Sequence, residues 1–433
     1  MRKLGRCGRQ RRSNHKDRIS QGISQTHQPE YVILLQWMKT TIGNSQWKSS
    51  CWHCLEPAYF KDTGRGLRAT KNFRPGEAII SIPLQFLITT STVFDSDIGA
   101  VLLKENKQLT PQQLLTIFLV IERYQGDKSP WFPYINTLPQ TYSTPLYFSK
   151  KEMNLLTPYA RSSAVQAEER FNKAFDIIKT IFQNSLSSFD RMCNESDIKW
   201  AWSTVNTRSV YFQTFPHPIL ILDPEESHLA LAPFLDLLNH LDSSKMSAGI
   251  NARTNCYDIV TLDTYKKHEQ VFICYGAHDN VKLLINYGFT LQSNINNSYI
   301  FTLDEISACL LDHIQYIDRK VSIVKEAQMD KNLACTVDGV SWSLMTTLKI
   351  FALQWKQLSL WKKLIQGATL SEENDKQAHE MASKLIKAAL IKAQKHLEFV
   401  NTQPQSTNFD LLISLSLDDV HILEGSLSSL RED

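Results

Sequence analysis

Two short stretches of this sequence, Asp236-Leu-Leu-Asn-His240 and Phe272-Ile-Cys-Tyr-Gly276, provide the strongest indication of its fold. Gly64-Arg-Gly66 lies far upstream of them, and a second tyrosine–glycine pair follows in Asn286-Tyr-Gly-Phe289. Each stretch is weak by itself, because an isolated Gly-x-Gly is usually a hairpin turn and a Tyr-Gly pair is common in a core or a turn. Their combination in one chain indicates a site assembled from segments that are far apart in the sequence.

The composition is typical of a soluble globular protein. Of the 433 residues, 42% are hydrophobic and 21% are charged, and the formal net charge is +3. That charge is too small to indicate nucleic-acid binding by the whole molecule, and we expect no specific nucleic-acid recognition. A chain of this length exceeds the roughly 100–200 residues of one domain, so we expect two domains. The eight cysteines stand at irregular spacing, which favours a reducing compartment.

The N-terminal segment is basic and rich in Gln, Ser and His, and we expect residues 1–30 to form a disordered basic arm. It lacks the apolar stretch of a secretory signal peptide. The longest apolar runs, such as residues 117–121, are far shorter than the ~20 residues that cross a bilayer. We therefore expect a protein of the cytoplasm and nucleus that does not enter a membrane. The arm is either a solvated tail or a nuclear address. Eight basic residues occupy its first eighteen positions: Arg2, Lys3, Arg6, Arg9, Arg11, Arg12, Lys16 and Arg18.

The predicted elements follow the order β segment, helical region, β segment and helical tail. Residues 67–90 read as strands around a Pro-Gly turn, Pro111 is placed to begin a helix, and residues 159–193 lack Gly and Pro, as long helices do. Other predicted elements are a helix at Tyr31–Met38, a capping box at Ser149–Glu152, and strands within Thr204–Gln213, Cys256–Leu262 and Gln270–Cys274.

The tail contains one strongly amphipathic helix. Thr369-Leu-Ser-Glu372 has the spacing of a capping box at its start. Apolar side chains at i, i+3, i+4 and i+7 spacing predict a face that packs on a core, formed by Ala378, Met381, Ala382, Leu385, Ile386 and Ala389.

Taken together, the glycine, Asn-His and Tyr-Gly stretches resemble the SET-domain methyltransferases, and within them the class of the plant Rubisco large-subunit methyltransferase and its animal relatives. The resemblance covers roughly residues 50 to 400. It implies an α+β fold: a SET-domain β-fold with knot-like threading over residues 50–290, a helical insert at about 95–200, and an all-helical substrate-binding domain over residues 300–433. In that family two distant segments close over S-adenosylmethionine, so this cofactor is expected here.

The resemblance also implies a role for individual residues. Tyr275 would be the catalytic residue that aligns the amine. The remaining chemistry would be shared between two groups: cofactor-binding residues Thr63, Gly64, Arg65, Gly66, Arg208, Asn239, His240 and Tyr275, and substrate-binding residues Arg208, Asp236, Tyr257 and Tyr287.

Several of these positions have a simpler interpretation. Asn239-His240 could end a helix, and Arg208 could form a salt bridge with Asp236 alongside its other role. Asp236 and His240 are four residues apart and could ligate a metal from one helical face, but two ligands are half a site. Cys51-Trp-His-Cys54 has zinc-knuckle spacing on one side only. We therefore expect no metal.

The expected reaction is methylation of a protein lysine, on histones or on other proteins. A lysine with a pKa near 10.4 must lose its proton at pH 7, which costs about 4.6 kcal/mol. A dry channel lined by tyrosines lowers that cost, because desolvation lowers the pKa of an amine while phenols attract the ammonium and accept its hydrogen bonds. The alternatives are a catalytically weak SET-fold binding protein and methylation of histidine. We expect a monomer whose partner is a protein substrate.

Overall fold

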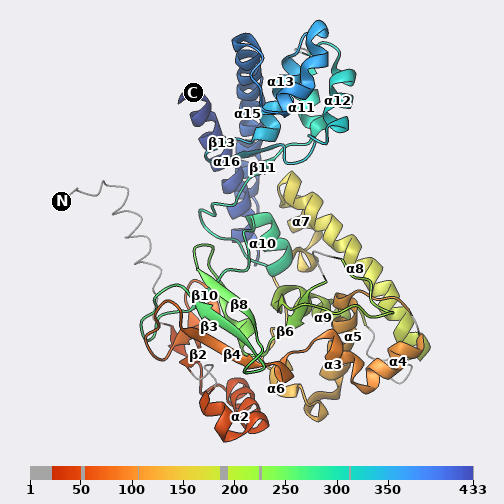
Figure 1. The fold of residues 1–433 in the computed structure, drawn as a ribbon, viewed down its shortest axis with the longest axis vertical. Coiled ribbons are helices and arrows are strands. Elements are labelled where there is room, and N and C mark those ends of the chain that lie inside the picture. Colours follow the sequence, from red (N-terminus) through yellow and green to blue (C-terminus); the bar gives the residue numbers. More distant parts are fainter. Residues whose placement is uncertain are drawn as a thin grey trace, which may run out of the picture. The chain divides into compact units, whose positions relative to one another are not determined.

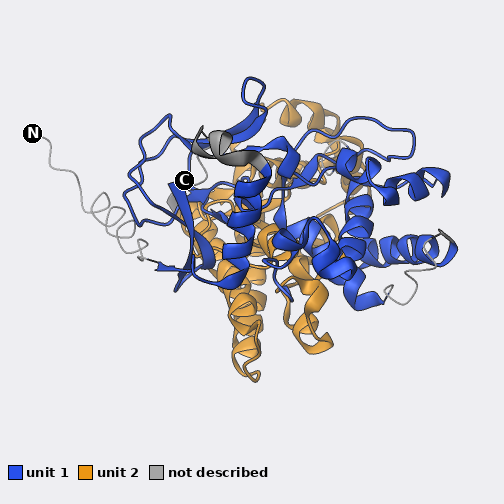
Figure 2. Ribbon diagram, turned by 90° about the horizontal axis from the view of Figure 1, so that it is seen from below, with its two compact units in different colours: residues 1–142, 168–277 blue, residues 143–167, 278–433 orange. Residues whose placement is uncertain are grey.

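The computed structural model describes residues 22–49, 54–105, 107–185, 194–223, 227–311 and 314–432. The chain divides into two compact units, residues 1–142 with 168–277, and residues 143–167 with 278–433 (Figure 2). Both units combine helices with short strands, as expected for an α+β protein (Figure 1). No helix in the described ranges is long and apolar enough to cross a membrane.

The first unit contains several small sheets instead of one large one. Among the sheet strands that its described residues form, one pair is parallel: β7 lies beside β10, with Asn239 opposite Phe272 and His240 opposite Ile273. The antiparallel sheets have the orders β1-β2-β3, β4-β9-β8 and β5-β6. The strand bounds are β1 (Ile23–Ser24), β2 (Leu55–Phe60), β3 (Gly64–Ala69), β4 (Ala78–Pro83), β5 (Ser209–Tyr211), β6 (Leu229–Leu231), β7 (Asn239–His240), β8 (Met246–Asn251), β9 (Cys256–Thr261) and β10 (Phe272–Ile273).

The basic arm predicted for residues 1–30 does not extend that far. Ile23-Ser24 forms strand β1, which pairs with β2, and Pro29 begins the next helix. The guanidinium of Arg68 donates to the Gly22 carbonyl, and Tyr31 is buried, so this segment is fixed to the unit. Residues 1–21 lie outside the described part of the chain.

The helices of the first unit confirm the predicted helix start at Pro111 and correct one predicted strand. Thr110 caps α5 in a capping box with Gln113. The strand predicted within Thr204–Gln213 is wrong for residues 204–208, which form the end of α9. Threonine favours strands, but the hydroxyls of Thr204 and Thr207 donate to backbone carbonyls inside this helix. The helix bounds are α2 (Pro29–Ser49), α3 (Thr90–Phe94), α4 (Asp97–Glu105), α5 (Pro111–Gln125), α6 (Phe132–Ile135), α8 (Pro158–Ser185, shared with the second unit) and α9 (Glu195–Arg208).

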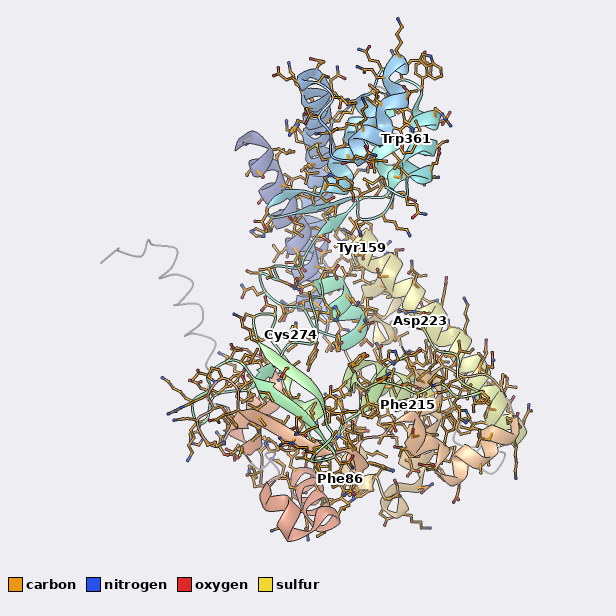
Figure 3. All side chains as sticks on the ribbon, viewed as in Figure 1. Phe86, Tyr159, Phe215, Asp223, Cys274 and Trp361 are labelled. Carbon is orange, nitrogen blue, oxygen red and sulfur yellow. The ribbon has the colours of Figure 1, made fainter. Side chains whose placement is uncertain are left out.

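The core of the first unit includes large aromatic side chains near its N-terminal helix. Phe86, labelled in Figure 3, is almost completely buried, and its ring meets the Trp37 ring of α2 edge-on at 5.0 Å between centroids. Aromatic pairs in this geometry add stability beyond burial alone. The contact ties α2 to the unit that carries the sheets.

The second unit is mainly helical, but the expectation that the tail is all-helical is wrong. A three-stranded antiparallel sheet, β11-β12-β13, lies within it. Its central strand carries the fully buried Cys335, so the sheet belongs to the core. The elements are α7 (Lys150–Leu155), α10 (Asn280–Tyr287), β11 (Tyr299–Ile300), α11 (Leu303–Leu310), α12 (Ile317–Glu326), β12 (Ala334–Thr336), β13 (Gly339–Val340), α13 (Trp342–Ala352), α14 (Trp361–Ile365), α15 (Glu372–Asn401) and α16 (Phe409–Glu432).

Three predictions from local patterns fall on residues of the second unit. The capping box at Ser149 and Glu152 is present at the start of α7. Most of the apolar face predicted from Ala378 to Ala389 is buried in the core of the second unit. The cap of α15 was misplaced, because Ser371, not Thr369, accepts the hydrogen bond from the Asn374 backbone.

Candidate active site

The candidate site is built on the hairpin between β2 and β3. Gly64 has φ +68°, which favours glycine, so the predicted turn is a real hairpin turn. At Gly66 a β-carbon would lie 2.8 Å from Asn239 Nδ2 and 2.9 Å from Gln270 Nε2. The absence of a side chain at this position therefore lets two distant segments approach the hairpin.

Two side-chain amides hold this turn. Asn239 Nδ2 donates to the Arg65 carbonyl at 2.9 Å. The amide of Gln270 exchanges hydrogen bonds with the Thr63 hydroxyl at 2.8 and 3.0 Å. Gln270 was not predicted as a site residue, because only the folded chain places it beside Gly66. The fold thus brings together five of the predicted cofactor-binding residues: Thr63, Gly64, Arg65, Gly66 and Asn239.

Tyr275 is held by the segment that contains β7. Its hydroxyl donates to the Leu238 carbonyl at 2.6 Å, and its backbone N–H donates to His240 Nδ1 at 3.0 Å. The two rings stack at 5.0 Å between centroids. Since Nδ1 accepts, the neutral imidazole carries its proton on Nε2. His240 and Tyr275 therefore fix each other through backbone and ring contacts.

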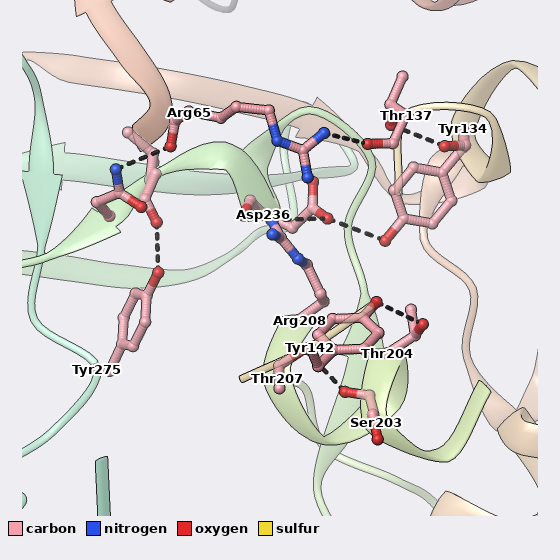
Figure 4. A network of polar contacts seen from close by, with 12 residues as sticks. Arg65, Tyr134, Thr137, Tyr142, Ser203, Thr204, Thr207, Arg208, Asp236 and Tyr275 are labelled. Atoms are coloured by element: carbon pink, nitrogen blue, oxygen red, sulfur yellow. Dashed lines mark hydrogen bonds and ion pairs between the residues drawn. The ribbon is translucent and has the colours of Figure 1, made fainter. Parts of the chain in front are cut away.

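A buried ion pair lies beside these residues. Arg208 Nη1 donates to the Asp236 carbonyl at 2.9 Å and lies 3.9 Å from Asp236 Oδ2, and the carboxylate also accepts from the Tyr134 hydroxyl at 3.1 Å (Figure 4). The salt bridge considered from the sequence is confirmed. Burial raises the pKa of Asp236, while the charge of Arg208 opposes this. The pKa of Tyr134 is raised well above its ordinary value by burial, so it remains a neutral donor.

The helical region adds residues that the motifs did not reveal. Arg65 Nη1 donates to the Thr137 carbonyl at 2.8 Å, so its guanidinium is held by the protein itself. Tyr142 and Thr204 are joined by a 2.6 Å hydrogen bond between their hydroxyls. No recognisable spacing marked Tyr134, Thr137 or Tyr142, because they come from turns and short helices that only the fold brings to Asp236 and Arg208.

The two remaining predicted substrate residues, Tyr257 and Tyr287, are carried by other elements. Tyr257 is on β9, as predicted, and its buried hydroxyl donates to the Tyr211 carbonyl at 3.0 Å. Tyr287 ends α10 in the second unit, where its ring stacks with His278 at 6.2 Å. Burial raises the pKa of both phenols.

Two alternatives considered from the sequence are wrong: Asn239-His240 does not end a helix, and Asp236 and His240 do not share the helical face that a metal site would need. Asn239 and His240 form a strand, and Asp236 lies in a separate 3₁₀ turn, so they do not share a helical face. Within the described residues, no group of three His, Cys, Asp or Glu side chains could hold a metal. Cys54 is buried, and Cys51–His53 lie outside the described residues.

Comparisons with known proteins identify two domain families in this sequence. The sequence matches the SET domain over residues 64–276 and the Rubisco LSMT substrate-binding domain over residues 313–417. The chain belongs to the SET-domain methyltransferase family, whose methyl donor is S-adenosylmethionine.

Two individual proteins and one solved structure show how similar the chain is to known members of this family. The chain is 32% identical to "SET domain-containing protein 4" of Homo sapiens, over 95% of this chain and 94% of that protein. It is 27% identical to "Actin-histidine N-methyltransferase" of Danio rerio, over 70% of this chain and 50% of that protein. Its fold matches the "SET domain of LSMT bound to Lysine and AdoHcy" with a TM-score of 0.63 and 17% identity, covering 94% of this chain and 92% of that one.

Proposed function

We propose that this protein transfers a methyl group from S-adenosylmethionine to a lysine side chain of a protein substrate, a histone or another protein. The observation that carries the proposal is the orientation of Tyr275, whose phenol is fixed by the Leu238 carbonyl beside the turn that Asn239 holds. A phenol held in this way is a preorganised polar group, the kind of group that stabilises a developing charge without reorganisation.

The residues around the turn fit a bound cofactor. Gly64 borders open space, since a β-carbon there would meet no atom within 4 Å. Backbone groups of residues 63–66 can therefore approach a ligand closely. When bound, S-adenosylmethionine supplies a methyl group already activated by its positive sulfur. We assign Thr63, Gly64, Arg65, Gly66, Asn239 and His240 to the binding of that cofactor.

The protein's own contribution would be alignment of the acceptor and exclusion of water. Tyr275 would orient the lysine amine, because its phenol oxygen can accept a hydrogen bond from an ammonium. Arg208 would stay charged, because its guanidinium lies against the Asp236 carboxylate. The ion pair would keep both side chains in one position while the amine approaches.

Histidine is the second candidate acceptor. It is supported by the relatives named for actin-histidine methylation, which are 24–27% identical to this chain. Lysine is preferred because phenols match the charge and the hydrogen bonds of an ammonium better than those of an imidazole. Mass spectrometry distinguishes the two acceptors directly.

The test uses full-length protein, S-adenosylmethionine and protein fractions from cells that lack this gene product. We expect new methyl groups on lysines, with release of S-adenosylhomocysteine. His240→Ala should weaken cofactor binding, and Tyr275→Phe should keep binding but transfer slowly. Methylation confined to histidines would overturn the lysine assignment. Cofactor binding without release of product would favour a binding protein.

A further inference from the structure

The second unit contains a cavity of about 230 Å³. This is smaller than the roughly 300–1,000 Å³ of pockets that hold drug-sized ligands, so its size suits one side chain or a small amine. Its lining comes from the start of α8, from α11, α15 and α16, and from the segment around β11, and includes Tyr299, Phe301, Glu305, Leu385, Ala389 and Asp419.

One part of the lining is aromatic and apolar. The rings of Tyr299 and Phe301 lie 4.9 Å apart between centroids, and Leu385 and Ala389 of α15 are buried. Aromatic faces attract a cation, while aliphatic side chains suit the methylene stem of lysine or arginine. This lining therefore fits a long side chain with a charged end.

A carboxyl group in the lining has no cation beside it. Asp419 makes no side-chain hydrogen bond or ion pair with any residue that the structure describes, whereas its neighbour Asp418 accepts from Asn280 at 2.7 Å. Burial, together with the charge of Asp418, raises the pKa of Asp419 to about 8. A carboxyl group in a desolvated cavity is stabilised by a cation that pairs with it.

The basic residues of the lining do not supply that cation. Lys392 is exposed and forms no ion pair with a described residue. His396 Nε2 lies 3.2 Å from the Leu155 carbonyl, and burial lowers its pKa, which favours the neutral ring. A second carboxylate, Glu305, also lines the cavity, and its Oε2 accepts from the Thr302 backbone at 2.8 Å.

We propose that this cavity receives a lysine or arginine side chain of the protein substrate, at a position other than the methylated residue. Its alkyl stem would lie along Leu385 and Ala389, and its charged group would meet Tyr299, Phe301 and Asp419. The statement that this side chain belongs to a protein substrate rests on the proposed function. The preference for a cation rests on the cavity alone.

The first experiment measures binding without catalysis. Full-length protein is titrated with N-acetyl-arginine amide, N-acetyl-lysine amide and the uncharged N-acetyl-citrulline amide, followed by ligand-observed NMR. We expect both cations to bind at least about tenfold more tightly than the citrulline compound. Asp419→Asn should remove that difference, because it deletes the charge but keeps the shape. Asp410→Asn, at an exposed position of the same helix, is the matched control and should change nothing.

Two further variants test the cavity by other means. Ala388 lies on α15 and lines the cavity, so Ala388→Leu should fill part of the cavity and block binding of the cations. Lys392→Met removes a like charge from the lining and should strengthen their binding. Equal binding of arginine and citrulline probes, or an Asp419→Asn variant that binds like Asp410→Asn, would overturn the proposal.

The second experiment separates this inference from the proposed function. With a validated protein substrate, Asp419→Asn should raise KM about fivefold or more and leave kcat near the parent value. If that substrate is methylated and its KM does not change, the cavity does not hold a substrate side chain while the methyltransferase assignment stands. If the cation probes bind as expected and no lysine is methylated, the cation site stands and the proposed function fails.

Discussion

Replacing Tyr275 with phenylalanine removes one hydroxyl and keeps the ring that stacks on His240. The structure predicts a cost in stability, because the hydroxyl donates to the carbonyl of the buried Leu238 at 2.6 Å. Leaving a buried acceptor without its donor costs about 1–3 kcal/mol. For a unit of 150–250 residues, each kcal/mol lowers Tm by roughly 2–4 °C, so a moderate fall is expected.

The catalytic loss should be larger than this. Removing one preorganised polar group from an active site commonly lowers the rate on the order of 10²–10³, which is equivalent to about 2.7–4 kcal/mol. The assays are scanning calorimetry, S-adenosylmethionine titration and initial rates of methyl transfer. The expected result is a protein that folds, binds cofactor and turns over very slowly.

A matched control separates catalysis from folding. Tyr265 is buried in the same unit, and its hydroxyl donates to the Phe272 carbonyl at 3.1 Å. Tyr265→Phe should lose no more stability than Tyr275→Phe, because Ser244 Oγ still donates to that carbonyl at 2.9 Å, and it should keep the methyl-transfer rate. The reasoning is refuted if Tyr275→Phe matches the parent rate on a validated substrate, or if both variants lose activity equally.

Three other predictions follow from single features. Gly66→Ala should weaken S-adenosylmethionine binding at least about tenfold in a titration, since its β-carbon would lie 2.8 Å from Asn239 Nδ2, whereas Gly249→Ala in open space should bind normally. The pKa of Asp419 is raised from 3.8 to about 8 in the folded protein, so the folded protein loses stability as the pH rises from about 4 through 8. Calorimetry should therefore show a higher Tm for Asp419→Asn than for the parent above pH 8, and little difference in Tm between them below pH 4. Removing residues 2–18 should leave the rate on a peptide intact and lower nuclear accumulation, and an unchanged distribution by imaging would reduce the arm to a passive tail.

The parts of the fold that could be predicted are those with a local physical cause. Pro111 and the Ser149–Glu152 pair mark helix starts because capping needs particular side chains at fixed positions. The buried face of α15 follows from helical periodicity alone. The end of α9 was misjudged because Thr204 and Thr207 are strand formers by propensity, yet both satisfy their hydroxyls inside a helix.

The candidate site could be predicted only in part, because only some of its residues have a local physical cause that a sequence pattern reveals. Glycine and asparagine could be singled out because their local roles are restrictive, whereas Gln270 and Tyr134 are ordinary residues until the fold places them beside Gly66 and Asp236. The backbone also adopts a conformation that no motif predicts: Phe234, before the turn that carries Asp236, has φ +70°. A bulky residue rarely has a positive φ, so this geometry is imposed by tertiary contacts.

The order of Asn239 and His240 has a physical explanation in strand geometry. Successive side chains of a strand point to opposite faces, so a two-residue strand offers one residue to each side. Asn239 reaches the Arg65 carbonyl on the hairpin, and His240 accepts from the Tyr275 backbone. A shift by one residue would exchange the two faces and break both contacts at once. The parallel pairing with β10 fixes that register, so this short strand holds the turn between β2 and β3 and Tyr275 in one arrangement.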